Sequence, residues 1–447
     1  MSTHANMVKM TVTGTPGTGT ITLNAASSGY RSFATAYGAN ATVDILITEG
    51  TSWEVARNCT YTHSGTTVTR GTLESSSTGS AVSFTSAAVV SVIAAAEFGN
   101  NAEMAIQAVT PGGRLTLESG VPVSTTDQTA KTNIYYTPYV HNIINLWDGS
   151  QWKPITFSED TLALGTLTAD RCHNVFAFLN AGALDLEIYQ WPQSTVTISN
   201  ASPGVVTWSS HGLTDGDMVS LSTTGTLPTG LLPNVTYYVV SAGTGFSLAA
   251  TIGGSAINTS SAGSGTHTAV AQRVTLQDGR YCKSGDKTRL LLGSFYTVNA
   301  TTTEDSIGAC CLWNAYNQRQ REIRAVDTGS HVINNVAREW NNGTALRIKF
   351  IVGLPARQVE FCSSRLQPST GLSYPYLYGY VDGTQTLAGG DANDFVANAT
   401  TTATSTLILR APFVASVGYH YASMFESEYG SVNCTVDYGK TYMSLTQ

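Results

Sequence analysis

Charged side chains are scarce in this sequence: Asp, Glu, Lys and Arg make up 12% of its 447 residues, about half of the ~25% that is usual for soluble proteins. The 30 acidic and 23 basic residues give a net charge of −7, and no stretch is rich in Lys or Arg. Phosphate backbones are bound by concentrated basic surfaces. We therefore expect no nucleic-acid partner.

Long apolar runs are also missing. The longest extends from Ala87 to Ala96 with one Ser inside it, far short of the ~20 residues that a membrane-spanning helix needs. The segment Met1 to Met10 lacks a basic stretch followed by an apolar one, so it does not resemble a secretory signal. The sequence predicts no membrane insertion.

Cysteine and histidine do not form metal-binding or redox motifs. The cysteines occur at irregular spacing without a CxxC pair, and the histidines never stand at metal-ligand spacing, so neither zinc nor another cofactor is expected. Two packed thiols are favoured at neighbouring Cys310 and Cys311, because a disulfide between neighbours is strained. We expect buried thiols at Cys59, Cys172, Cys282, Cys310, Cys311, Cys362 and Cys434.

Small polar residues, Val and Tyr take the place of charge, and they favour strands and turns over helices. Short alternating segments such as Ile45 to Glu49 and Thr67 to Arg70 predict strands. Asp148-Gly149, between the aromatic strands Ile143 to Trp147 and Trp152 to Phe157, predicts a hairpin. The fold class is all-β, with several small sandwich or barrel modules in tandem and one inserted into another.

Four domains are predicted. The segment Ser194 to Val270 contains no Lys, Arg or Cys, and the surrounding pattern resumes at Arg273. A self-contained module inserted into a surface loop would explain this change, because surface loops tolerate insertions. The predicted domains are an N-terminal attachment module (1–112), a discontinuous central domain (113–192 plus 273–334), an inserted small barrel (193–272) and a C-terminal sandwich (335–447).

Three stretches carry a family resemblance. The inserted segment, with PGVVTWSSHGLTDGDMVSLSTTGTLPTGL and TYYVVSAGTGFSLAATIGGSAINTSSAGSGTHT, resembles a β-barrel repeat of phage tail and fibre proteins. LQDGRYCKSGDKTRLLLGSF and TEDSIGACCLWNAYNQRQRE resemble a domain that recurs in tail-fibre, tail-associated and head-fibre proteins. ITEGTSWEVARNCTYTHSGTTVTRGTLESSSTG is similar to modules of the same proteins. The resemblance implies a tailed-bacteriophage virion component without catalytic residues, and a trimer.

Few residues suggest chemistry. The acid pairs Glu159-Asp160, Glu304-Asp305 and Glu426-Glu428 have the residue type that glycoside cleavage uses, but neighbouring acids more often cap turns or face solvent. Asp391, Asn393 and Asp394 resemble part of a calcium loop whose downstream Glu is missing, so an Asx turn is favoured. We therefore expect no catalytic, cofactor-binding or metal-binding residues.

A row of tyrosines is the main candidate contact surface. Tyr374, Tyr376, Tyr378 and Tyr380 alternate, which places all four on one face of a strand. Such a row holds sugar rings or packs against another subunit. An ordinary core-facing sheet surface explains the row equally well.

Together these features predict a non-catalytic phage fibre, spike or tail-associated protein that assembles in the host cytoplasm and serves host adsorption from the virion surface. The expected partners are copies of itself, closing with symmetry as a homotrimer, other virion proteins of the tail, portal adaptor or capsid, and a host surface glycan. The alternatives are a head decoration protein without receptor binding and a tailspike that depolymerises glycans.

Overall fold

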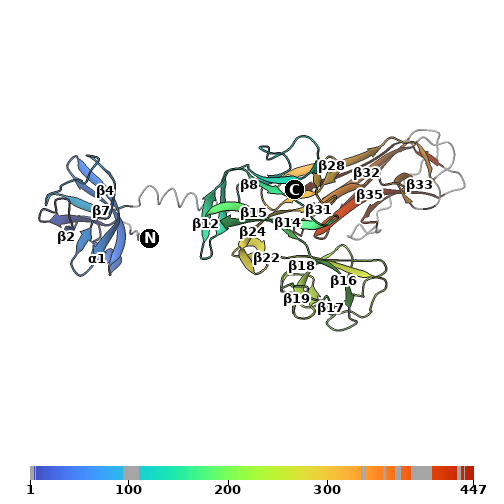
Figure 1. The fold of residues 1–447 in the computed structure, drawn as a ribbon, viewed down its shortest axis with the longest axis horizontal. Helices are drawn as coiled ribbons and strands as arrows, with labels where there is room; N and C mark the ends of the chain where they lie inside the picture. The colour runs from blue at the N-terminus through green and yellow to red at the C-terminus, as the bar shows by residue number, and fades with distance from the viewer. Residues whose placement is uncertain are drawn as a thin grey trace. The chain divides into compact units, whose positions relative to one another are not determined.

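The computed structural model describes residues 5, 7–93, 110–333, 336, 338–355, 359–367, 374–383, 405–429, 434–436 and 438–446. It is 52% strand and 2% helix, which confirms the all-β fold class. Contacts divide the chain into two compact units, Met1–Gln107 and Ala108–Gln447. Each unit is built from short, mostly antiparallel strands (Figure 1).

The first unit is a closed six-stranded barrel. Its ring follows the order β3-β7-β1-β2-β5-β4 and closes through pairing of β3 with β4, while β6 adds to the outside of β4. The predicted strands at Ile45 to Glu49 and Thr67 to Arg70 are confirmed. The elements are β1 (Lys9–Thr13), β2 (Ile21–Ala26), α1 (Phe33–Tyr37), β3 (Ala41–Glu49), β4 (Ser52–Thr62), β5 (Thr67–Thr69), β6 (Thr72–Ser76) and β7 (Val89–Val92).

The barrel surrounds an apolar core and a buried ion pair. Alternate residues of β3 and β4 point inward, as expected for strands with one buried face. Glu54 accepts hydrogen bonds from the Arg70 guanidinium, at 3.1 Å to Oε2, and from the Val82 amide at 2.8 Å. Arg70 in turn donates to the carbonyls of Val82 and Gly17, so both terminal nitrogens of its guanidinium have partners, while its buried Nε has none.

The second unit begins with short sheets packed around one core. The predicted hairpin is confirmed: Trp147 pairs with Trp152, and the Asp148 carboxylate accepts from the amides of Ser150 and Gln151 in the turn. The strands are β8 (Gly113–Thr116), β10 (Asn133–Pro138) and β13 (Asp160–Ala163) in one sheet, β11 (Ile143–Trp147) and β12 (Trp152–Thr156) in the hairpin, and β14 (Cys172–Asn180), β15 (Ala183–Gln190), β22 (Val274–Gln277), β23 (Arg280–Lys283), β24 (Asp286–Tyr296) and β27 (Leu312–Asn314) in a third.

Residues 193–272, here called the inserted barrel, lie between β15 and β22. Six strands form a sheet with its own apolar core, and a bridge between Val206 and Phe246 brings its two ends together. Entry and exit are adjacent because Gln193 pairs with Val270 (Figure 1). Its strands are β16 (Gln193–Ile198), β17 (Val206–Thr207), β18 (Met218–Thr223), β19 (Thr236–Val240), β20 (Ser247–Ala249) and β21 (His267–Gln272).

The C-terminal sheets recruit strands from earlier in the chain. β26 pairs with β31, and β28 pairs with β37, so strands from both sides of the predicted boundary at 334/335 share sheets. The four-domain division stays a prediction. The strands are β9 (Gln128–Lys131), β25 (Thr303–Asp305), β26 (Ala309–Cys310), β28 (Gln320–Asp327), β29 (His331–Ile333), β30 (Arg338–Glu339), β31 (Ile348–Val352), β32 (Val359–Gln367), β33 (Tyr374–Val381), β34 (Ser405–Phe413), β35 (Gly418–Tyr429), β36 (Cys434–Val436) and β37 (Tyr438–Thr446).

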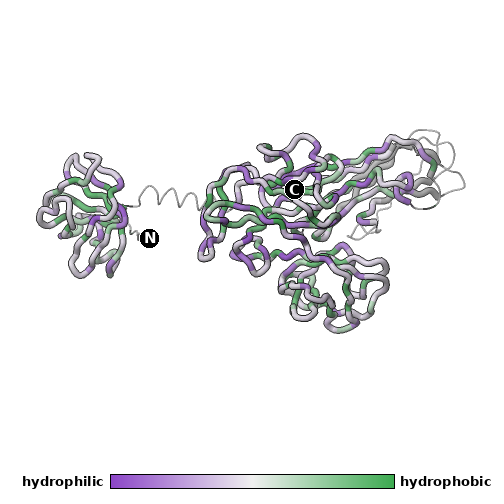
Figure 2. The backbone as a smooth tube through the Cα atoms, in the orientation of Figure 1, coloured by the Kyte–Doolittle hydropathy of each residue, from purple (hydrophilic) through white to green (hydrophobic). Residues whose placement is uncertain are grey.

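Hydropathy follows the strand pattern. Hydrophobic and hydrophilic stretches alternate along the backbone of both units (Figure 2), which is the pattern of sheets with one buried face. One apolar cluster joins the inserted barrel to the body of the second unit, through Met218 of β18, Trp191, Val274 and Val417. The inserted barrel is therefore packed against the body rather than attached only by its two connections.

Candidate binding sites

The tyrosine row lies on β33, which contains all four residues, so the expectation that they share one strand is confirmed. β33 pairs with β35 from Tyr374 opposite Tyr429 to Val381 opposite Ala422. Tyr380 is buried, and its ring centroid lies 3.9 Å from that of Phe425. Tyr380 therefore packs inside the protein. The other three side chains lie outside the described part of the chain, and the contact role of the row stays a prediction.

Two of the acidic residues considered for glycoside cleavage, Glu159 and Asp305, are held by local partners. Glu159 accepts hydrogen bonds from Ser119, Gly120 and Thr137 at 2.6 Å each. Partial burial raises the pKa of Glu159, but these hydrogen bonds outweigh it and lower the pKa overall. Asp305 pairs with Arg321 at 2.5 Å. This arrangement is typical of carboxylates that fasten turns and strands.

Glu426 is fully buried among donors. His331 Nε2 lies 2.7 Å from its Oε1, and Arg338 Nε lies 3.3 Å from the same atom. The Asn341 amide donates to it as well. A buried carboxylate requires such a cation and hydrogen bonds to offset its lost hydration, so these contacts are accounted for by a structural role. The side chain of its sequence partner, Glu428, lies outside the described residues.

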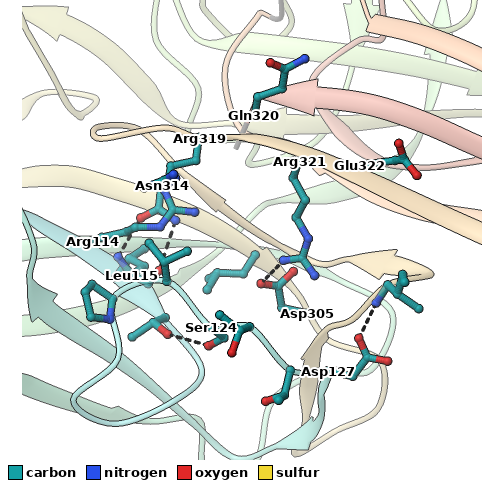
Figure 3. Close-up of a pocket in the computed structure, with 17 residues that line it drawn as sticks. Arg114, Leu115, Ser124, Asp127, Asp305, Asn314, Arg319, Gln320, Arg321 and Glu322 are labelled. Carbon is teal, nitrogen blue, oxygen red and sulfur yellow. Dashed lines mark hydrogen bonds and ion pairs between the residues drawn. The ribbon is translucent and has the colours of Figure 1, made fainter.

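An arginine-lined cavity of about 260 Å³ opens between β8, the segment 122–127 and β28 (Figure 3). Arg114 donates to the Asn317 carbonyl at 2.7 Å, and Arg319 donates to the Tyr139 hydroxyl at 2.7 Å. Burial lowers the pKa of Arg114, while the charge of Asp305 opposes that shift. Arg319 and Arg321 are two residues apart in the sequence. The segment 122–127 is held by a 3.4 Å contact between the Thr116 and Ser124 hydroxyls and by the Ile307 amide, which donates to Asp127 at 2.7 Å.

A second cavity, here called the seam cavity, lies between the inserted barrel and the body, with a volume of about 280 Å³. The inserted barrel contributes Gln193, Ser220, Leu221, Ser222, Asn234 and Val270 to its lining. The body contributes Asp170, Arg171, Cys172, Trp191, Tyr296, Asp382 and the segment Ser416 to His420. Small-molecule sites occur preferentially at such boundaries between structural units.

Two hydrogen-bond networks hold the walls of the seam cavity together. The Val417 amide donates to Thr236 Oγ1 of the inserted barrel at 2.9 Å. Buried Asn174 accepts through Oδ1 from Trp191 Nε1 at 2.8 Å and from Gln272 Nε2 at 3.3 Å, and Gln272 also donates to the Gly353 carbonyl. Because these partners are buried, their loss would leave unpaired polar groups. These hydrogen bonds therefore fasten the inserted barrel to the body beside the cavity.

A serine, a histidine and an aspartate meet in the seam cavity. His420 Nδ1 lies 2.7 Å from Asp382 Oδ2, and Ser416 Oγ lies 3.5 Å from His420 Nε2. The same Nε2 lies only 2.7 Å from the Ser416 carbonyl oxygen. Burial lowers the pKa of His420, but the charge and hydrogen bond of Asp382 outweigh it and raise the pKa overall. An imidazolium that donates to both partners is not placed to accept the serine proton.

Polar groups with few partners stand at the mouth of the seam cavity. Asp170 accepts from the Tyr296 hydroxyl at 3.1 Å, and Arg171 donates to the Asp170 carbonyl at 2.9 Å. Neither side chain has an ion pair with any described residue. The rings of Tyr296 and Tyr419 stack with centroids 3.7 Å apart. Burial first, and then the charge of Asp170, raises the pKa of Tyr296.

Sequence reasoning missed the seam cavity. Its members come from eight separate stretches between Asp170 and His420, and no short motif connects them. Asp382 and His420 are brought together only because β33 pairs with β35. A possible indication was the pair Asp170-Arg171, which is charged in a sequence with little charge.

The remaining candidates are structural. Five cysteines are free and buried, which confirms the expectation at these positions, and burial raises the pKa of Cys59 to about 11 and that of Cys172 to about 12. Among the described residues no group of three side chains is placed to hold a metal ion. Asp391, Asn393 and Asp394 lie outside the described residues. No helix in the described ranges is long and apolar enough to cross a membrane.

No family model matches the sequence, and no curated protein matches it. Similar solved structures include one of infectious bursal disease virus Gx strain, with 10% identity, 73% of each chain covered and a TM-score of 0.21. Dimeric latent PorU from Porphyromonas gingivalis is 10% identical over 57% of this chain and 24% of that chain, with a TM-score of 0.20. The insecticidal δ-endotoxin Cry8Ea1 from Bacillus thuringiensis is 7% identical over 76% of this chain and 52% of that chain, with a TM-score of 0.19. These TM-scores are too low to support a functional argument.

Proposed function

We propose that the chain is a structural component of a tailed-phage virion, presented on the particle surface as a fibre, spike or tail-associated protein for assembly and host adsorption. The observation that carries the proposal is that the stretches resembling phage proteins coincide with β units. Residues 203–268 lie in the inserted barrel, and residues 276–295 form the end of β22, then β23 and β24. The resemblance therefore falls on structural modules.

The architecture supports assembly as the mode of action. Separate apolar cores fill the two barrels and the body of the second unit, so several β modules in one chain provide an extended surface with little charge. Low charge and small polar side chains suit burial against further copies of the chain, and closed symmetry is the common result. The proposed state is a homotrimer, as the phage resemblance implies.

The sites described above support a non-catalytic role. Glu159, Asp305 and Glu426 are occupied by hydrogen bonds or ion pairs. The histidine beside Ser416 donates from both ring nitrogens instead of accepting the serine proton. Burial raises the thiol pKa at the five described cysteines, which keeps them protonated and poor nucleophiles.

Locating the protein in purified particles tests the proposal. Antibodies against the chain, detected by gold labelling in electron micrographs, should mark the tail tip, baseplate or fibres, and antibody treatment should block adsorption. Labelling of the capsid with adsorption intact would favour a head decoration protein instead. Absence of the chain from particles that remain infectious would overturn the virion assignment.

A further inference from the structure

We propose that the seam cavity binds a neutral, hydroxyl-rich saccharide, with the inserted barrel and the body each supplying one wall. This inference rests on the proposed function, for which it names a ligand class and a site. The seam cavity has a volume of about 280 Å³, close to the lower limit of small-ligand sites, which measure roughly 300 to 1,000 Å³. The cavity therefore suits a small sugar unit.

The polar groups of the mouth match the chemistry of sugar hydroxyls. A carboxylate accepts from two neighbouring hydroxyls, and a guanidinium donates to two oxygens in a fixed geometry. Asp170 and Arg171 provide this pair on the body, with Asp170 exposed and Arg171 half-buried. Across the cavity, Gln193 and Ser222 are exposed on the inserted barrel and offer an amide and a hydroxyl.

The charge of the cavity favours a neutral ligand. Asp170 and Arg171 are of opposite sign and adjacent in the chain. Deeper in the cavity, His420 is paired with Asp382 at 2.7 Å. With these charges balanced, an anion gains no net attraction, whereas hydroxyl groups find both donors and acceptors. This balance argues against phosphate or a sulfated glycan.

An aromatic wall of the cavity is suited to pack against the apolar face of a sugar ring. Tyr296 and Tyr419 both line the cavity and stack on each other, with 12° between the ring planes. Aromatic rings combine a large apolar surface with a polar edge, which suits the C–H face and the hydroxyl rim of a pyranose. The hydroxyl of Tyr296 is already oriented by Asp170, so the ring is held in place before binding.

The experiment is a binding screen with the full chain on an array of bacterial surface oligosaccharides, followed by NMR titration with the strongest hit. Asp170→Asn and Arg171→Gln should each weaken the affinity at least tenfold, and Gln193→Ala, on the opposite wall, should weaken it several-fold. Arg324→Gln is the matched control, because Arg324 is an exposed arginine of β28 outside the cavity lining. It should leave binding unchanged. Melting curves check that all variants fold.

Two outcomes would overturn the inference: an array without binding at millimolar sugar, or binding that Asp170→Asn, Arg171→Gln and Gln193→Ala leave unchanged. Preference for anionic over neutral oligosaccharides would contradict the ligand class. Virion labelling separates this failure from failure of the proposed function. If the chain is found on the particle but binds no sugar on the array, only the saccharide site is rejected. If the chain binds sugar but is absent from particles, the virion role is rejected.

Discussion

Buried His420 and partly exposed Asp382 form an ion pair, 2.7 Å from Nδ1 to Oδ2, that ties β35 to the turn after β33. The second imidazole nitrogen, Nε2, contacts the Ser416 carbonyl oxygen, so the ring spans two segments beside the seam cavity. The Asp382 carboxylate also accepts from the Tyr421 amide at 3.0 Å. The pair fixes the floor of the cavity and makes its stability sensitive to pH.

The sign of this pH dependence follows from the raised pKa of His420. The stabilisation is fully present below the unfolded pKa of about 6.5 and is lost as pH rises through the higher folded pKa. Asp382→Asn should lower the free energy of unfolding by about 2 kcal/mol at pH 6, with a smaller loss at pH 9. Urea unfolding at both pH values measures this. A loss that grows with pH would contradict the ion pair.

His173 should show the opposite dependence. It is fully buried and stacked on Phe295. Burial lowers the pKa of His173 to about 4, although a hydrogen bond to the Arg171 carbonyl favours the charged form. As pH falls, His173 is protonated in the unfolded chain before it is protonated in the folded one. The free energy of unfolding therefore decreases between pH 6.5 and pH 4, by about 3 kcal/mol in total. His173→Phe should remove this part of the acid sensitivity. If the difference in unfolding free energy between pH 7 and pH 4.5 is the same in His173→Phe as in the unmodified chain, the assignment is refuted.

The ion pair inside the first barrel predicts a large effect confined to one unit. Glu54→Ala leaves the Arg70 charge buried without its carboxylate, which should cost about 3 kcal/mol. Glu74→Ala is the matched control, since the pair of Glu74 on β6 with Arg57 on β4 is partly exposed and such pairs contribute little to stability. Calorimetry should show the transition of the first unit moving alone in Glu54→Ala. Equal shifts for both variants would contradict the buried pair.

The tyrosine row predicts a division of roles along one strand. Tyr376→Ala and Tyr378→Ala should weaken oligomerisation or adsorption while folding stays near normal. Tyr380→Ala should instead destabilise the fold by about 3 kcal/mol, as loss of a buried aromatic does, because Tyr380 packs on Phe425. Sedimentation, adsorption assays and melting curves distinguish these effects. Normal assembly and adsorption in Tyr376→Ala and Tyr378→Ala would show that the row is an ordinary sheet face without a contact role.

Local patterns predicted local structure well. The alternation of β3 and the Asp148-Gly149 turn are decided by neighbouring residues, so the strands and the hairpin could be read from the sequence. The boundary expected at 334/335 depended on where the family resemblance ends. It could not anticipate that β28 pairs with β37 across more than a hundred residues, because such pairing is selected by packing of the whole unit.

The sites were less predictable for the same reason. Asp170 and Gln193 reach one cavity because the inserted barrel is packed through Met218 against Trp191 and Val417. No spacing rule connects these positions. Conversely, Tyr380 belongs to a row that looks like a contact surface in sequence, yet its ring is buried. Burial of one face of a strand is decided by the neighbouring layer.

The central claim is that the chain acts by assembly, and its mass in solution tests this most directly. Light scattering on the purified full chain, supported by heat-resistant migration on a denaturing gel, should give three times the mass of one chain, independent of dilution. A mass equal to that of a single chain at every concentration would contradict self-assembly into a trimer.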